Sequence, residues 1–128
     1  MLNVVCAIIY VGNKILITQR SDKMKLPLKW EFPGGKLENE ESEIECIKRE
    51  IKEELNIDIR IIKKLSNRIH DYSDFRINLI PYVVEYKSGD IILMEHTAFQ
   101  LIEKHDLNIF DWAEADLPIV REIVNSET

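Results

Sequence analysis

Residues 34–57 read GGKLENEESEIECIKREIKEELNI, and this stretch decides the fold and the chemistry open to the chain. After the two glycines, apolar residues recur at Ile44, Ile47, Ile51 and Leu55. Spacing of three and four residues is typical of an amphipathic α-helix with one buried face. We therefore predict a helix here whose buried stripe consists of these four residues.

Three carboxylates share one edge of this predicted helix. At about 100° per residue, Glu50 and Glu54 lie one turn apart, and Glu53 lies one turn from Glu50 and beside Glu54. Like charges at such spacing repel each other and raise each other's pKa values. A hard divalent cation such as Mg²⁺, which prefers oxygen ligands, would remove that cost. Because a glutamate-rich helix is more often a solvated face, the carboxylates alone leave both interpretations open.

The spacing of the stretch resembles the signature of the Nudix hydrolases. That signature reads Gly, five residues, Glu, seven residues, Arg-Glu, apolar, any, Glu-Glu, any, Gly, apolar. One position departs from it, since Asn56 stands where the last Gly is usual; Asn is the common second choice for a left-handed residue that ends a helix. The matching positions are Gly35, Glu41, Arg49, Glu50, Ile51, Glu53, Glu54 and Ile57.

The resemblance implies both a fold and a reaction. The run Lys29–Lys36, KWEFPGGK, looks like the lead-in of the MutT type within this family. The implied fold is α+β, an α/β/α sandwich with a mixed β-sheet in which the signature forms a loop-helix-loop. The implied reaction is hydrolysis of a nucleoside diphosphate linked to another group, with Mg²⁺ or Mn²⁺ as cofactor.

The same resemblance assigns residues to a metal site and to catalysis. Glu50 is the favoured general base, with Glu53 or Glu95 as the alternative, and Arg49 is expected to pair with the glutamates and orient them. Glu41 is expected to support them in a similar way. The predicted metal ligands are the Gly34 carbonyl and the side chains of Glu50, Glu53, Glu54 and Glu95.

A second set of residues is expected at the substrate. Arg20 could equally be a solvated strand end, and Asp116 could equally cap the helix that begins near Pro118. As a substrate residue, Asp116 would accept a hydrogen bond from an exocyclic amino group of the base. The predicted substrate-binding residues are Arg20, Glu31, Phe32, Lys36, Tyr72 and Asp116.

The substrate itself is less well defined than the reaction. A MutT-like enzyme would release pyrophosphate and a monophosphate from a nucleoside triphosphate, for example to remove 8-oxo-dGTP from the nucleotide pool. The segment Trp112–Pro118, WAEADLP, looks similar to members that act on CTP, dCTP or methylated dCTP. An alternative of another class is a non-catalytic Nudix domain that senses nucleotides.

Composition limits the setting in which this chemistry takes place. The chain has 128 residues, 45 % hydrophobic and 31 % charged, as expected for one soluble domain over residues 1–128. The net charge of −6 argues against a nucleic-acid polymer as partner. Neither a membrane-length apolar run nor a signal peptide is recognisable, so we expect a cytoplasmic monomer or homodimer. Cys6 and Cys46 read as small core residues without a disulfide.

The remaining segments predict a strand-rich frame around the helix. Pro33-Gly34-Gly35 should form a turn, and Pro81 should mark a sheet edge or a bulge. Residues 67–74 read as a polar connection. Strands are expected at 2–10, 15–19, 30–32, 58–66, 75–86, 91–94 and 98–102, the first two joined as a hairpin, and a closing helix at 119–124.

Overall fold

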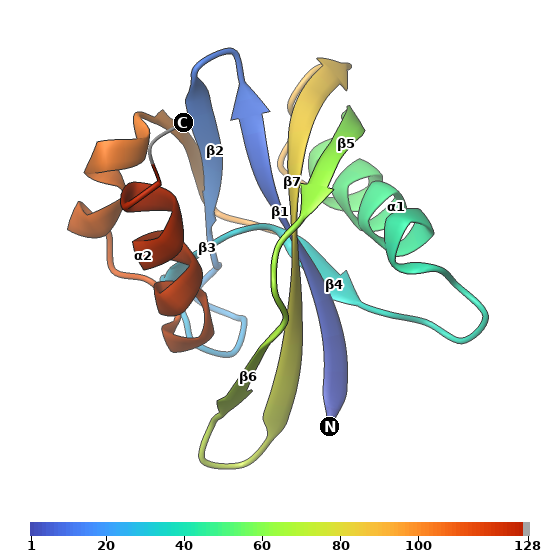
Figure 1. Ribbon diagram of the computed structural model, residues 1–128, viewed down its shortest axis with the longest axis vertical. Coiled ribbons are helices and arrows are strands. Elements are labelled where there is room, and N and C mark those ends of the chain that lie inside the picture. Colours follow the sequence, from blue (N-terminus) through green and yellow to red (C-terminus); the bar gives the residue numbers. More distant parts are fainter. Residues whose placement is uncertain (127–128) are drawn as a thin grey trace.

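The computed structural model describes residues 1–126, so the last two residues of the predicted domain lie outside it. A sheet stands in the middle, with helix α1 on one side and helix α2 on the other (Figure 1). The strands are β1 (Leu2–Val11), β2 (Lys14–Gln19), β3 (Trp30–Glu31), β4 (Gly34–Lys36), β5 (Asp58–Lys64), β6 (Arg68–Asp71), β7 (Arg76–Ser88) and β8 (Ala98–Ile102). The helices are α1 (Glu43–Leu55) and α2 (Leu117–Val124), with short 3₁₀ helices η1 (Lys104–Ile109) and η2 (Glu114–Asp116).

The sheet is mixed, as predicted. Its order is β3-β2-β1-β7-β5, with β4 paired to β1, β6 to β7 and β8 to β2. The long central strands β1 and β7 are parallel, with Leu2 opposite Ile77 and Tyr10 opposite Glu85. β1 and β2 form the predicted antiparallel hairpin, and Gly12 in its turn has a φ of 64°.

Alternate side chains of the sheet feed two separate cores. Val5, Ala7 and Ile9 of β1 pack with the α1 side, whereas Cys6 and Ile8 pack with the α2 side. This alternation follows from the two-residue period of a strand. Because both faces of β1 are covered, its nearly continuous apolar sequence is explained, and the predicted α/β/α sandwich is confirmed.

Helix α1 is capped at both ends by residues of the signature stretch. The Ser42 hydroxyl accepts from the Glu45 amide at 3.1 Å, and the Glu45 carboxylate accepts from the Ser42 amide at 2.9 Å. This reciprocal pair is a capping box. At the other end Asn56 has φ 62° and ψ 26°, the left-handed conformation predicted for it.

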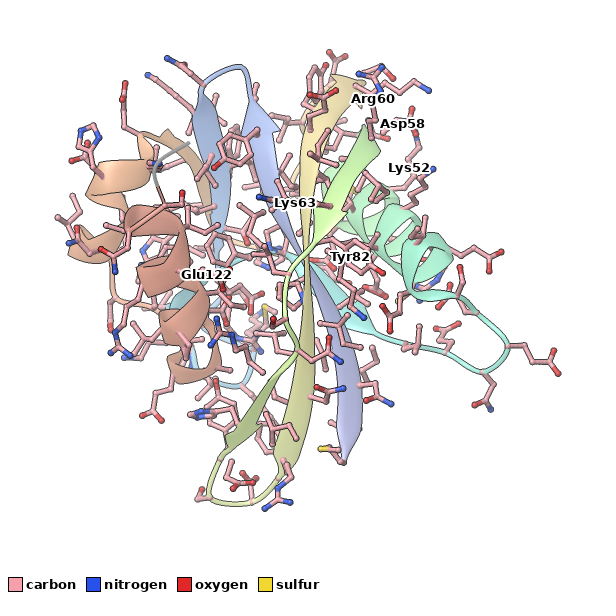
Figure 2. All side chains as sticks on the ribbon, in the orientation of Figure 1. Lys52, Asp58, Arg60, Lys63, Tyr82 and Glu122 are labelled. Atoms are coloured by element: carbon pink, nitrogen blue, oxygen red, sulfur yellow. The ribbon has the colours of Figure 1, made fainter. Side chains whose placement is uncertain are left out.

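Ion pairs between elements extend this framework to the surface. Figure 2 shows Lys52 of α1 and Asp58 at the start of β5 at the same end of the molecule, with Lys52 Nζ and Asp58 Oδ1 3.6 Å apart. Glu122 lies on α2 on the other side of the sheet (Figure 2) and pairs with Arg68 of β6 at 2.5 Å.

Two predictions about the helix and the glycines are wrong. Ile44 is 42 % exposed in the first turn of α1, outside the buried core cluster on this side of the sheet, and Cys46 joins the buried face instead. Residues 34–36 do not form a turn but strand β4, paired with β1. A side chain at Gly34 would approach the Val5 carbonyl oxygen to 1.9 Å, so glycine is needed here for close strand packing.

Three predictions about the strands also need correction. Residues 91–94 are not a strand; their backbone amides bond the end of α1, as from Ile92 to the Leu55 carbonyl at 3.0 Å. Residues 67–74 contain strand β6 rather than only a connection. Pro81 lies in the central strand β7, opposite the gap between β5 and β6, where no partner requires its missing amide; the neighbouring bulge is in β5, between Ile61 and Lys63.

Candidate active site

Arg49 organises the exposed side of the signature helix. Its Nε and Nη2 bond the two carboxylate oxygens of Glu41 at 2.6 and 3.0 Å. Its Nη1 bonds Glu50 at 2.8 Å and Glu53 at 3.2 Å. The bond from Arg49 lowers the pKa of Glu41 to about 2, and the Glu41 carboxylate first and the Glu50 carboxylate next raise the pKa of Arg49. The pairing predicted for Arg49 is therefore present, with Glu41 as its bidentate partner.

The three glutamates of α1 have different surroundings although they share one edge. The Glu53 side chain is 58 % exposed, that of Glu50 is 16 % exposed, and that of Glu54 is 3 % exposed. Burial raises the pKa of Glu54 first, and a hydrogen bond with Glu50 and the charges of Glu31, Glu50 and Glu95 raise it further. Glu54 therefore holds its proton more tightly than an ordinary carboxyl group while no cation compensates its charge.

Gly35 lets the Glu50 carboxylate lie directly on strand β4. A Cβ at Gly35 would come within 2.1 Å of Glu50 Oε2. Only a hydrogen atom fits in this space. The glycine that begins the signature thus has a direct steric reason, since it allows the helix carboxylate to reach the backbone of the adjacent strand.

A cavity of about 350 Å³ opens beside these carboxylates. All six predicted substrate-binding residues line it, together with Gly34, Glu54 and Glu95 from the predicted metal set. Arg49, Glu50 and Glu53 are not among its lining residues. Of the described α1 carboxylates, Glu54 alone thus lines the cavity, whereas apolar wall is supplied by Phe32, Tyr72, Phe75, Ile77, Leu79 and Ala115.

Asp116 lies in the apolar part of the cavity and is 6 % exposed. Its Oδ2 accepts a hydrogen bond from the Phe32 amide at 2.9 Å, and its side chain makes no capping bond to α2. The capping interpretation is therefore wrong. Burial, and next the nearby charge of Glu31, raise the pKa of Asp116 well above its usual value. A protonated Asp116 can donate a hydrogen bond as well as accept one, which widens the expected role as an acceptor only.

Aromatic side chains hold the walls around Asp116. The Phe32 and Trp112 rings lie 4.8 Å apart, and the Tyr72 and Phe75 rings stack at 4.9 Å. The Tyr72 hydroxyl accepts from the Ala115 amide at 3.0 Å, which ties the hairpin of β6 and β7 to η2. These contacts give the cavity flat apolar walls of the kind on which a nucleobase can stack.

Arg20 lies inside this site rather than at a solvated strand end. Its Nη1 bonds Glu31 Oε1 at 2.8 Å, and its side chain is 19 % exposed. Glu31 Oε2 lies 2.8 Å from Nε2 of His96, which is 6 % exposed. From the sequence alone, His96 reads as a residue that makes local hydrogen bonds, with a role as a ligand as the less favoured alternative. Its burial was not evident from the sequence, because it lies in an irregular segment without periodic pattern.

The donor set fits a hard divalent cation by its chemistry. In residues 1–126 no three His, Cys, Asp or Glu side chains already converge on one metal position, since Arg49 occupies Glu50 and Glu53. However, Glu54 Oε2 is buried without a hydrogen-bond partner. A cation would supply the positive charge that this carboxylate lacks, and all predicted side-chain ligands offer oxygen. The predicted ligand set stays a prediction.

Comparison with known proteins fixes the family of this site. The sequence model of the protein family described as NUDIX domain matches residues 1–123. The chain belongs to the Nudix family. Members of this family generally use divalent metal ions, in agreement with the oxygen-rich end of the cavity.

The relatives of this Nudix hydrolase include a CTP pyrophosphohydrolase, an 8-oxo-dGTP diphosphatase and a MutT protein. The chain is 32 % identical to a CTP pyrophosphohydrolase of Escherichia coli (strain K12), over 94 % of this chain and 89 % of that protein. It is 30 % identical to an 8-oxo-dGTP diphosphatase of Buchnera aphidicola, over 94 % and 92 % of the two chains. The solution structure of the MutT protein of methicillin-resistant Staphylococcus aureus 252 has 41 % identity and a TM-score of 0.77, over 96 % and 95 %. The prediction of a MutT-like Nudix hydrolase is confirmed.

Two findings concern the predicted setting. The cysteines Cys6 and Cys46 are free and buried, as predicted, and burial is the main cause that raises the pKa of both thiols, that of Cys46 to about 12. Within residues 1–126, none of the helices has the length and apolar character needed to cross a membrane.

Proposed function

We propose that this Nudix hydrolase converts a nucleoside triphosphate to the monophosphate and pyrophosphate with Mg²⁺ or Mn²⁺. One observation carries the proposal: a single cavity joins the Glu54 and Glu95 carboxylates to an aromatic, buried end that contains Asp116. A polyphosphate with its cation suits the first end, and a flat base with polar edges suits the second. A cavity with these two ends agrees with membership of the family to which the relatives named above belong.

The residues of the first end have distinct proposed tasks. The Gly34 carbonyl, Glu50, Glu53, Glu54 and Glu95 would hold the cation, which when bound would neutralise phosphate charge and acidify water. Glu50 would take the proton of the attacking water, with Glu53 or Glu95 as the alternative base. Arg49 would keep Glu50 and Glu53 in place through its bonds to both. Lys36, which is exposed at the end of β4, would contact a phosphate.

The residues of the second end would select the base. Phe32 and Tyr72 would pack against its ring, and Asp116 would pair with its polar edge. The candidate triphosphates are 8-oxo-dGTP, in nucleotide-pool sanitation, and CTP, dCTP or methylated dCTP, each supported by the activity of a relative named above or by the segment 112–118. The enzyme would act on this small substrate in the cytoplasm as a monomer or homodimer, without a nucleic-acid polymer as partner.

The test is release of pyrophosphate and monophosphate from a panel of canonical, oxidised and methylated NTPs and dNTPs, with Mg²⁺, with Mn²⁺ and with EDTA. We expect cation-dependent release with one preferred base. Glu54→Gln and Glu53→Gln should lower kcat while the circular dichroism spectrum is retained, roughly 10²–10³-fold if each supplies a few kcal/mol to the transition state. Wild-type turnover in both variants would refute the proposal.

A non-catalytic nucleotide sensor is the alternative outcome of the same panel. It predicts nucleotide binding, measured by calorimetry, without release of pyrophosphate from any substrate. The retention of every signature glutamate and of the Arg49 network favours the enzyme.

A further inference from the structure

A chain of polar side chains, partly buried at Arg20 and Glu31 and buried at His96 and Glu54, links the substrate cavity to the signature helix. It runs from Arg20 to Glu31 at 2.8 Å, and from Glu31 to His96 at 2.8 Å. From His96 Nδ1 to Glu54 Oε1 the distance is 3.7 Å. The His96 imidazole, which lies between the two glutamates, is 1 % exposed and is therefore shielded from water.

The backbone on either side of His96 is fixed to the two elements that this chain connects. The Met94 amide bonds the Glu54 carbonyl at 3.0 Å, at the end of α1. The Thr97 amide bonds the Gln19 carbonyl at 3.0 Å, at the end of β2 and beside Arg20. The irregular segment of residues 89–97 therefore carries the imidazole into the space between α1 and β2.

The hydrogen-bond partners of Glu31 and Glu54 show which nitrogen of the His96 imidazole donates and which has no partner. Both carboxylate oxygens of Glu31 are occupied, one by Arg20 and the other by His96 Nε2, and because a carboxylate oxygen accepts, Nε2 donates. The other ring nitrogen, Nδ1, has no hydrogen-bond partner, and neither has Glu54 Oε2. Two unpartnered buried polar atoms on adjoining side chains are costly, which makes a purely structural role a poor explanation.

We infer that His96 is a positioning residue that fixes the guanidinium of Arg20 through Glu31 and limits where the Glu54 carboxylate can lie by the contact of its own ring at 3.7 Å. Glu31 then acts through Arg20 and His96 rather than by contact with substrate. The inference rests on the proposed function, in which Glu54 holds the cation and Arg20 faces the nucleotide. One buried ring thereby sets the geometry at both ends of the cavity.

Two substitutions separate the two halves of this role. In His96→Gln the side-chain amide can reach the position of Nε2 and still donate to Glu31, but the ring nitrogen that lies against Glu54 is lost. In His96→Asn the amide lies near the position of Nδ1 and no longer reaches Glu31. His105→Gln is the matched control, because the His105 side chain is 72 % exposed and lies outside the site.

The first readout is the Kd for Mn²⁺ by electron paramagnetic resonance without nucleotide, and the second is KM and kcat on the best substrate of the panel. We expect His96→Gln to weaken Mn²⁺ binding about 10–100-fold, the usual effect of losing a group that orients a metal ligand, with little change in KM. We expect His96→Asn to raise KM about 10-fold with a smaller change in the Mn²⁺ Kd. His105→Gln should match the wild type in all three quantities.

Wild-type Mn²⁺ binding and KM in both His96 variants would overturn the inference. Glu54→Gln in the same titration separates this failure from that of the proposed function. If Glu54→Gln binds Mn²⁺ like the wild type, the proposed metal site is wrong; if it loses Mn²⁺ while both His96 variants keep it, only the inference is wrong. If the His96 variants do not fold, Glu31→Gln serves as the test variant. Its amide nitrogen is a donor that would face another donor, either Arg20 or His96 Nε2. An unchanged KM in Glu31→Gln would overturn the inference equally.

Discussion

The glutamates around Arg49 and the acids buried along the cavity are the same functional group in opposite environments. Glu41 lies against the Arg49 guanidinium, which holds its pKa at about 2. Asp116 lies among Phe32, Tyr72 and Ala115 at the apolar end, where burial raises its pKa well above the usual value. Glu54 is raised as well, by burial and by neighbouring acids. The difference is due to the partner and the access of water, not to the residue type.

This contrast divides the cavity by the kind of ligand that each end can bind. At the end near Arg49, the guanidinium of that residue pairs with the carboxylates of Glu41 and Glu50 and holds them in place. These carboxylates offer oxygen ligands to an added metal ion. The end near Asp116 offers polar atoms without a fixed charge between aromatic rings. A nucleotide with a charged polyphosphate and a neutral base has the same division, and four predictions test it.

Substitution of Arg49 should have the largest effect. Arg49→Lys keeps the positive charge but cannot bond both oxygens of Glu41 while it also bonds Glu50 and Glu53. We expect kcat to fall about 10–100-fold, the usual result when a group that orients metal ligands is lost. The measurement is steady-state hydrolysis of the preferred nucleotide. Lys48→Gln, on the exposed face of the same helix, is the control and should keep wild-type activity. Wild-type activity in Arg49→Lys as well would show that the positive charge of residue 49 suffices and that its bonding geometry does not matter.

The two glycines of β4 should separate stability from activity. In Gly34→Ala the new Cβ meets the backbone oxygen of Val5 at 1.9 Å, and the paired strand must move. We expect a loss of about 1–3 kcal/mol in the free energy of unfolding, the range for overpacked sites. In Gly35→Ala the new Cβ meets the Glu50 carboxylate at 2.1 Å, the end of a flexible side chain. Activity should fall in this variant while urea denaturation stays near the wild type, and the reverse pattern would contradict the proposed role of Glu50.

The pH dependence of stability should have opposite signs at the two ends. Glu41 has a lowered pKa, so its contribution is complete above its usual value of 4.5 and is lost as pH falls toward about 2. The advantage of the wild type over Glu41→Gln should therefore shrink below about pH 4.5. Asp116 has a raised pKa, so its contribution is complete below its usual value of 3.8 and is lost as pH rises through the higher folded value.

Asp116→Asn should accordingly gain stability relative to the wild type as pH rises from about 4 to neutrality. The Asn oxygen can still accept from the Phe32 amide, so the packing is matched. Urea denaturation curves at several pH values measure both variants. Parallel pH profiles for Asp116→Asn and the wild type would show that Asp116 is charged in the folded protein.

The sequence was sufficient for the parts of the fold that depend on local pattern. Spacing predicted α1, and the apolar run and turn residues predicted the hairpin of β1 and β2. The Ser42–Glu45 capping box was not among the predictions, although Ser followed three residues later by Glu is a local pattern that marks a helix start. Ile44 shows the limit of periodicity, because a residue on the apolar stripe is buried only where another element covers it.

The parts that could not be predicted depend on contacts between distant segments. Asp116 meets Phe32 across 84 positions of the chain, and His96 meets Glu31 across 65. No local pattern encodes these pairs, so the burial that raises the pKa of Asp116 was not evident. Gly34 shows the same limit, since its sequence favours a turn while its need for glycine comes from β1. The family resemblance supplied the position of these residues but not their environment.

The smallest effect is expected at Asn56, the residue that departs from the signature. Its φ of 62° is a left-handed conformation that costs a residue with a plain Cβ roughly 1–2 kcal/mol, and Asn less because its side chain bonds locally. Here Asn56 Nδ2 donates to the Asp90 carbonyl at 3.2 Å. We expect Asn56→Ala to lower the free energy of unfolding by about 1 kcal/mol. Asn56→Gly should stay within about 0.5 kcal/mol of the wild type, since easier backbone geometry offsets the lost bond. Both should keep wild-type kcat; a loss of activity in Asn56→Gly would mean that the usual glycine of the signature cannot replace Asn56, and that its bond to Asp90 positions Glu54 as well as ending the helix.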